Sequence, residues 1–176
     1  KKNKNKKDFF FNIFGDQEKI NDELNKNKTS KENIKIFHTT SVVSDEESPL
    51  KAIKNSKNSS MWNAVNSQLN VGSDITVSAG NTGVLFVISK MILKNIDKIS
   101  RPALAALWPN KKGTNVVLDL GANVECDENN LVEFAEMGAA LYKSLFISEV
   151  PKVALLNIGS EEIKGTDTIK KAYNIL

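Results

Sequence analysis

The stretch DITVSAGNTGVLFVISKMILKN, residues 74–95, decides the fold class of this sequence. It begins with a short β-branched run at residues 75–77, continues through small and polar residues, and ends in a longer apolar stretch at residues 81–95. The short run is typical of a strand and the longer stretch of a helix. We therefore expect a strand, a tight turn and a helix, which is the repeating unit of an α/β domain with a largely parallel sheet.

From residue 74 onward short apolar runs alternate repeatedly with longer amphipathic stretches, and local patterns predict further elements earlier in the chain. Towards the C-terminus the alternation predicts strands at residues 103–107, 116–120 and 153–156, and helices at residues 129–145 and 166–174. Towards the N-terminus the local patterns predict strands at residues 9–14 and 34–38, and helices at residues 17–25, from Pro49 onward, and after residues 58–60, where Met61, Val65 and Leu69 recur on one face. These elements predict one domain, or most of one.

The composition is that of an ordinary globular protein. Of 176 residues, 40% are hydrophobic and 26% are charged, and the formal net charge is +3. Five of the positive charges lie in the opening KKNKNKK, residues 1–7, so the rest of the chain is slightly acidic. A short basic run can be an arm for nucleic acid or anionic lipid, but a solvated surface segment is its commoner meaning, and we expect no nucleic-acid partner.

The counts of cysteine and histidine exclude several kinds of site. Cys126 is the only cysteine, so an intrachain disulfide framework is impossible and a reducing cytoplasm fits. His38 is the only histidine, so a familiar zinc site is not expected, and no G-x-S-x-G elbow supplies a nucleophilic serine. The longest apolar stretch, residues 83–93, is too short to span a membrane. We expect neither a metal nor a cofactor.

Three predicted strands end in small and polar residues. The segments are ITVSAGNTG at residues 75–83, VVLDLGANV at residues 116–124 and VALLNIGSEEIKG at residues 153–165. In an open α/β sheet, the carboxyl ends of the strands line the crevice where ligands bind. We therefore expect these three segments to converge on one site.

The first of these segments is suited to an anion such as phosphate. Gly80 and Gly83 allow a tight turn, and Ser78, Asn81 and Thr82 offer hydrogen bonds beside the free amides of a helix N-terminus. The alternative is an ordinary turn in which Asn81 only caps the helix. The segment is neither a Walker A loop nor a G-x-G-x-x-G fingerprint, which disfavours a nucleoside triphosphate.

The other two segments carry charged residues. Asp119 and Asn123 flank a glycine turn, and a buried Asp119 carboxylate needs partners, although a capping role is equally open. Glu161 and Lys164 lie at the mouth of the last predicted strand. Lys164 could face an anion held by Asn81 and Thr82, whereas the alternative is a solvated turn before the last helix.

Four motifs give the sequence a family resemblance. They are SAGNTG at residues 78–83, RPALAAL at residues 101–107, LDLGANV at residues 118–124 and LLNIGSEEIKG at residues 155–165, and lesser matches include HTT at residues 38–40 and KNSSM at residues 57–61. In this order they resemble the phosphate acyltransferase family of bacterial phospholipid synthesis. The resemblance covers nearly the whole chain.

The resemblance implies a fold, a reaction and partners. The fold would be a three-layer α/β/α domain with a mostly parallel sheet, similar to phosphotransacetylase and isopropylmalate dehydrogenase. The reaction would convert acyl-acyl-carrier-protein and inorganic phosphate to acyl phosphate and free carrier protein. Members are homodimers of the cytoplasm that associate peripherally with the membrane. Lys164, Asn123 and Asn157 would then act in catalysis, with Asp119 and Glu161 in support and residues 78–83 holding phosphate.

The sequence also departs from the family pattern. The family begins with a strand carrying D-A-M-G-G-D, which does not precede Lys1, and it continues with further motifs beyond Leu176. Residues 1–176 are therefore expected to form a partial phosphate acyltransferase domain, without the N-terminal strand and the C-terminal part. Two alternatives remain: an acyl-CoA enzyme similar to phosphotransacetylase, and a non-catalytic module that binds an anion or a partner.

Overall fold

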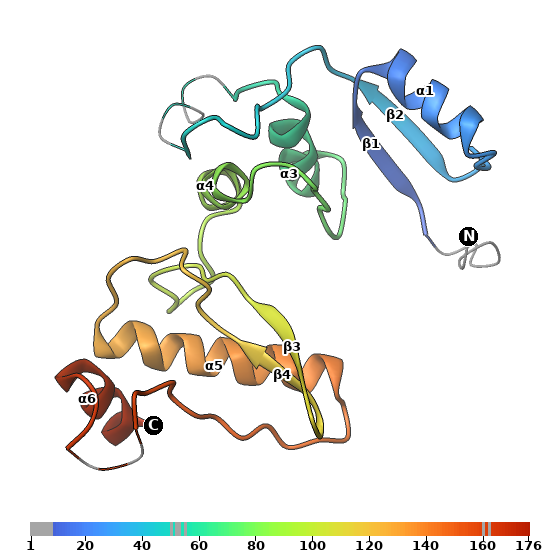
Figure 1. The fold of residues 1–176 in the computed structure, drawn as a ribbon. Coiled ribbons are helices and arrows are strands. Elements are labelled where there is room, and N and C mark those ends of the chain that lie inside the picture. The colour runs from blue at the N-terminus through green and yellow to red at the C-terminus, as the bar shows by residue number, and fades with distance from the viewer. Residues whose placement is uncertain (1–8, 50, 52–53, 55, 160, 162) are drawn as a thin grey trace. The chain divides into compact units, whose positions relative to one another are not determined.

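The fold is described from a computed structural model that covers residues 9–49, 51, 54, 56–159, 161 and 163–176. The chain divides into two compact units, Lys1–Lys94 and Asn95–Leu176. Figure 1 shows the helices and strands of each unit. Each unit is described by itself below.

The first unit opens with a strand, a helix and a strand. β1 (Phe11–Gly15) and β2 (Ile34–His38) pair in parallel, and α1 (Gln17–Lys26) connects them (Figure 1). The Asp16 side chain caps α1 by accepting hydrogen bonds from the backbone amides of Glu18 and Lys19. The elements predicted at residues 9–14, 17–25 and 34–38 are confirmed, and the structure adds that the two strands pair in parallel.

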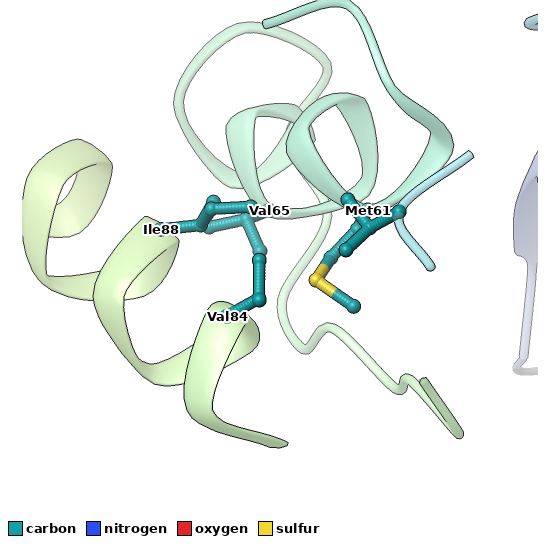
Figure 2. Close-up of a cluster of buried hydrophobic side chains, with 5 residues drawn as sticks. Met61, Val65, Val84 and Ile88 are labelled. Atoms are coloured by element: carbon teal, nitrogen blue, oxygen red, sulfur yellow. The ribbon is translucent and has the colours of Figure 1, made fainter. Parts of the chain in front are cut away.

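Two further helices enclose the core of this unit. α3 (Ser60–Asn70) is capped by Ser59 and α4 (Thr82–Leu93) by Asn81. Figure 2 shows the buried side chains that point towards one another between these helices. The buried cluster comprises Val43, Met61, Val65, Val84 and Ile88, bordered by Trp62, Leu85 and Ile92. Deletion of a large buried side chain from such a cluster typically costs about 2–5 kcal/mol.

Leu69 does not join this cluster, although its spacing from Met61 and Val65 predicted that it would. Its side chain is 64% exposed. Four residues turn an α-helix through about 400°, so residues at this spacing drift around the axis and Leu69 lies about 80° from Met61. The helix itself, predicted after residues 58–60, is confirmed. The helix predicted from Pro49 includes positions that lie outside the described residues.

The second unit contains a hairpin and two helices. β3 (Ala106–Asn110) and β4 (Gly113–Val117) pair antiparallel, and α5 (Glu128–Leu145) runs beside them (Figure 1). Asp127 caps α5, and α6 (Asp167–Ile175) packs against α5. The helices predicted at residues 129–145 and 166–174 are confirmed, as was the one within residues 81–95 in the first unit. Among the described residues, none of the helices has both the length and the hydropathy of a membrane-spanning segment.

The strand predictions beyond residue 74 need correction. Residues 75–77 and 153–156 form no strand in the described structure, and Val77 and Leu156 are 89% and 92% exposed. A strand exists only where a neighbour takes its hydrogen bonds, and no described segment pairs with these residues. The strands expected at residues 103–107 and 116–120 are shifted to β3 and β4. Their pairing is antiparallel because a two-residue loop joins them, which a parallel pair does not permit. Over the residues that the structure describes, the fold is therefore mixed α/β, with β1 and β2 as the parallel strand pair and an isolated parallel bridge between Ser41 and Ser59.

Candidate functional site

The loop at residues 78–83 leads into α4, and Asn81 fixes its shape. The Asn81 Oδ1 atom accepts a hydrogen bond from the Val84 amide at 3.0 Å, which caps the helix. Its Nδ2 atom donates to the carbonyl oxygens of Asp45 at 2.8 Å and Glu47 at 3.1 Å. One side chain thus ties the start of α4 to a segment more than thirty residues earlier.

The two glycines of this loop allow close packing. A Cβ atom at Gly80 would lie 3.0 Å from Met61 Cε, and one at Gly83 would lie 3.0 Å from Pro49 Cγ. The Gly80 amide donates to Ser78 Oγ at 3.2 Å. Thr82 and Gly83 are the first two residues of α4, so helix geometry gives their amides no partner within the helix. These amides, with the Thr82 hydroxyl, are the groups of the loop that an anion can use.

Asp119 organises a turn in the second unit. Its Oδ1 atom accepts from the Leu104 amide at 2.9 Å, and its Oδ2 atom accepts from the Asn123 amide at 2.7 Å and from Asn123 Nδ2 at 3.1 Å. Partial burial acts to raise the pKa of this carboxyl, but the N–H donors of Leu104, Asn123 and Ala122 outweigh burial, and the pKa lies below its ordinary value. Asp119 is therefore a charged, hydrogen-bonded anchor.

Asn123 shares this turn. Its Nδ2 atom donates to the carbonyl oxygen of Pro102 at 2.9 Å as well as to Asp119. An amide group has two N–H donors, so both are engaged. In this conformation the Oδ1 atom is the part of the Asn123 side chain with hydrogen-bonding capacity to spare.

Asn157 and Lys164 close a local turn. The Asn157 Oδ1 atom accepts from the Ile158 amide at 2.9 Å, and its Nδ2 atom lies 3.4 Å from the Lys164 carbonyl oxygen. The Lys164 amide donates to the Glu161 carbonyl oxygen at 2.9 Å. Gly165 has a φ of +89°, and a Cβ there would lie 2.5 Å from Asn157 Oδ1, so only glycine fits. Within the described residues the Lys164 ammonium joins no ion pair, which leaves its charge available.

The predicted site residues thus fall in both units. Residues 78–83 belong to the first unit, whereas Asp119, Asn123, Asn157 and Lys164 belong to the second, as does Glu161. Within the second unit, the structure brings Asp119 together with Asn123, and Asn157 together with the backbone of Lys164. The convergence of the three segments on one site stays a prediction.

Cys126 lies near the Asp119 turn, in partly buried surroundings. Burial raises the pKa of its thiol, and the negative charge of Asp119 acts in the same direction. The thiol therefore stays protonated near neutral pH, which does not favour a nucleophile. No three His, Cys, Asp or Glu side chains gather as a possible metal site in the part of the chain that the structure describes.

Sequence reasoning missed a polar pocket at the carboxyl ends of β1 and β2. The pocket has a volume of about 250 Å³, and it is lined on the strand side by Phe37, His38 and Thr39. α3 contributes three asparagines, Asn63, Asn66 and Asn70. The HTT motif after a strand and the asparagines at positions 63, 66 and 70 of a predicted helix were the available signals. Their proximity depends on tertiary packing, which neither pattern reveals.

Comparison with known proteins relates the whole chain to one group. A family model described as fatty acid synthesis protein matches residues 1–176. The chain is 55% identical over 167 residues to a phosphate acyltransferase of Pelagibacter ubique, covering 95% of this chain and 50% of that protein. Phosphate acyltransferases of Maricaulis maris and Caulobacter vibrioides are 45% and 44% identical, over 80% and 94% of this chain and 40% and 46% of their own lengths. The chain spans about half the length of the curated relatives it matches.

Proposed function

The chain belongs to the fatty acid synthesis protein family, and from this premise we propose that it serves a phosphate acyltransferase reaction. The reaction converts acyl-acyl-carrier-protein and inorganic phosphate into acyl phosphate and free carrier protein. The observation that carries the proposal is the 55% identity, over 95% of this chain, to a protein named phosphate acyltransferase. The relatives are about twice as long as this chain. The experiment below therefore tests whether this chain has the activity by itself.

The chemistry needs no nucleophile from the protein. A phosphate oxygen attacks the thioester carbonyl carbon, the C–O bond forms, and the C–S bond breaks. The thiolate leaves with the carrier and takes up a proton. The protein has two tasks: to orient phosphate against the carbonyl and to stabilise the oxyanion that develops there, and each can contribute several kcal/mol. The protonated Cys126 thiol is consistent with this scheme, because no step uses it.

The loop before α4 is the phosphate-holding element of the proposal. The amides of Thr82 and Gly83 and the positive end of the α4 dipole attract an anion. Ser78 and Gly80 shape the loop through their mutual hydrogen bond. Asn81 holds the loop in place through its bonds to residues 45 and 47, so its role is positioning.

The second unit supplies the remaining groups. Lys164 brings a cation that neutralises phosphate or the tetrahedral oxyanion. Asn157 positions the turn that carries Lys164 and is proposed as a neutral partner for the substrate. Asn123 has the same proposed role as a neutral donor, which requires its side-chain N–H groups to leave Pro102 or Asp119, whereas Asp119 fixes its turn through the Asn123 backbone amide. Glu161 supports the Lys164 turn through its backbone carbonyl. The proposal requires both units to present these groups to one cleft.

The proposal extends to architecture and partners. The βαβ segment of the first unit and the helices that accompany the strands support a three-layer α/β/α domain. The family would act as a homodimer in the cytoplasm with peripheral membrane association, where its acyl phosphate product is used. Acyl-acyl-carrier-protein and inorganic phosphate are the proposed partners.

The test is phosphate-dependent release of free carrier protein from a long-chain acyl-acyl-carrier-protein by the 176-residue chain. Release that requires phosphate is the expected result. Lys164→Ala is expected to slow it by about 10²–10³-fold, as loss of one oxyanion-stabilising group does. Lys143→Ala removes an exposed lysine of α5 and serves as the matched control, with an unchanged rate.

Two outcomes would contradict the proposal. No release above the rate without protein would show that this chain does not perform the reaction. Equal losses in Lys164→Ala and Lys143→Ala would remove the specific role of Lys164. In both cases the folded state of each variant is checked by circular dichroism, so that unfolding is not read as loss of chemistry.

A further inference from the structure

Position 101 carries the only arginine of the chain. The sequence has 24 lysines and arginines, and all of them except Arg101 are lysine. A composition so biased towards lysine indicates that position 101 uses a property that lysine lacks. That property is the planar guanidinium fork, which can bind two oxygen atoms of one oxyanion at once, whereas the lysine ammonium is a point charge.

The backbone on both sides of Arg101 is held in place. The amide and the hydroxyl of Ser100 both donate to Glu133 Oε2 of α5, each at 2.8 Å. Three residues beyond Arg101, the Leu104 amide donates to Asp119 Oδ1 at 2.9 Å. The Arg101 side chain therefore starts from a fixed position beside the Asp119 turn of the candidate site.

The guanidinium lies next to the end of the LDLGANV segment. Arg101 Nη1 donates to the Glu125 carbonyl oxygen at 2.6 Å, two residues beyond Asn123. Burial raises the pKa of the neighbouring Cys126 thiol, and of the charges that act on it Asp119 raises the pKa and Arg101 lowers it. Both charges therefore lie near this thiol. The fork is thus placed beside the turn that carries Asn123.

The bond to the carbonyl oxygen does not explain why arginine is present. A lysine ammonium can donate to a carbonyl oxygen equally well. The bond engages one of the five guanidinium N–H groups, and among the described residues the edge formed by Nε and Nη2 has no partner. Arg101 is exposed and joins no ion pair in the described part of the chain, although Glu125 and Asp127 are close to it in the fold.

The acidic residues around the fork determine what kind of anion it suits. The Asp127 carboxylate accepts from the Asn130 amide at 2.8 Å, and the Glu128 carboxylate pairs with Lys171 at 3.7 Å. These negative charges oppose an anion that is attracted by charge alone. An anion is held there only by directed hydrogen bonds, which the two parallel N–H groups of a guanidinium edge provide.

We propose that Arg101 binds two oxygen atoms of the phosphate substrate through its Nε and Nη2 N–H groups. The inference rests on the proposed function, because phosphate is the oxyanion that the reaction consumes. It gives the second unit a directional phosphate contact in addition to the charge of Lys164. A bidentate contact also fixes the orientation of the phosphate, which is one of the two tasks of the protein in this chemistry.

The experiment titrates the isotope-labelled 176-residue chain with inorganic phosphate at constant ionic strength and follows the arginine Nε–H signal by NMR. Because Arg101 is the only arginine, this signal has a single source. We expect it to shift and to saturate with a Kd of about 1 mM, a reasonable affinity for so small an ion. The backbone amides of Asn123 and Cys126 should report the same Kd.

Two variants test the fork and the charge separately. Arg101→Lys keeps the positive charge and the capacity to donate to the Glu125 carbonyl oxygen, but it removes the fork. We expect it to weaken phosphate binding about tenfold, measured through the Asn123 and Cys126 amides. Lys143→Ala removes one positive charge from α5 in the same unit and should leave the Kd unchanged.

Three results would overturn the inference. The first is no shift of the Arg101 Nε–H signal at about 10 mM phosphate, ten times the expected Kd. The second is an unchanged phosphate Kd in Arg101→Lys with the rest of the spectrum preserved. The third is a lower Kd for acetate than for phosphate at the Arg101 signal, which would assign the fork to a carboxylate instead.

The reaction assay separates this inference from the proposed function. Phosphate binding that depends on Arg101, without phosphate-dependent release of carrier protein, supports the inference and contradicts the reaction for this chain. Release with an unchanged kcat/KM for phosphate in Arg101→Lys supports the reaction and contradicts the inference.

Discussion

Asn81 and Asn157 each follow a predicted strand and precede a helix, yet their side chains connect the chain over different ranges. Asn81 caps α4 and reaches back to residues 45 and 47. Asn157 bonds to residue 158 and to residue 164, within its own turn. The same residue type in similar sequence contexts is a long-range tie in one unit and a local turn former in the other. We therefore expect removal of the Asn81 side chain to lower the free energy of unfolding more than removal of the Asn157 side chain.

Asn81→Ala is expected to have the largest effect on stability. The variant loses a helix cap, worth about 0.5–2 kcal/mol, and two hydrogen bonds to the backbone, one exposed and one part-buried, each worth about 0.5–1.5 kcal/mol. We expect the free energy of unfolding of the first unit to fall by about 2–4 kcal/mol. Urea unfolding, monitored by Trp62 fluorescence, measures it. Asn174→Ala, which removes an exposed asparagine of α6, is the control. A loss no larger than that of the control would contradict the role of Asn81 as a long-range tie.

Asp119→Ala is expected to come next. The side chain accepts hydrogen bonds from Leu104 and Asn123, and charge-assisted bonds are stronger than neutral ones. Because Asp119 is only partly buried, we expect a loss of about 1.5–3 kcal/mol in the second unit, rather than the sum of all its bonds. Denaturation monitored by Trp108 fluorescence reports on this unit. An unchanged midpoint would show that the turn does not need the carboxylate.

Acidification should reproduce part of that loss. The pKa of folded Asp119 lies below its ordinary value of 3.8, so its stabilising contribution is fully present above that value and is lost as pH falls through the folded pKa. We expect the second unit of the unmodified chain to lose more stability between about pH 5 and pH 2 than the Asp119→Asn variant does. Parallel slopes in the two proteins would contradict the lowered pKa.

Asn157→Ala is expected to have the smallest effect. Its hydrogen bonds are exposed and local, and one of them is long. We expect a loss below about 0.5 kcal/mol, within the usual range for surface substitutions. If carrier-protein release nevertheless falls steeply, Asn157 serves the substrate and not the fold. A stability loss equal to that of Asn81→Ala would remove the distinction between the two asparagines.

The elements with local signals were predictable from the sequence. Asp16, Ser59, Asn81 and Asp127 each cap a helix that was expected close to its observed position. A helix cap and an apolar helix face both depend on residues that are close together in the sequence, so one sequence is enough to predict them. The structure shows that Asn81 caps α4, and the anion-binding role of the loop stays a prediction beside it.

Strands and pockets depend on partners that are distant in the sequence. The run at residues 75–77 has the composition of a strand, but composition does not provide the neighbour that completes its hydrogen bonds. The sequence likewise did not predict that Thr39 and Asn66 line one pocket, because Thr39 follows a strand and Asn66 lies on a helix. For the candidate site, the sequence predicted which residues are suited to the chemistry. It did not establish that the three segments carrying them meet in one place.

The exposed run VALLNI at residues 153–158 has a practical consequence for handling the protein. It is six residues of largely apolar, uncharged composition without proline, and Leu156 and Ile158 are largely exposed. Such hexapeptides form intermolecular cross-β contacts, so turbidity should grow with concentration and ionic strength. Lys152, just before the run, acts as a gatekeeper by repelling identical copies. Its charge, rather than any packing contact, would then set how concentrated a clear solution of this chain can be.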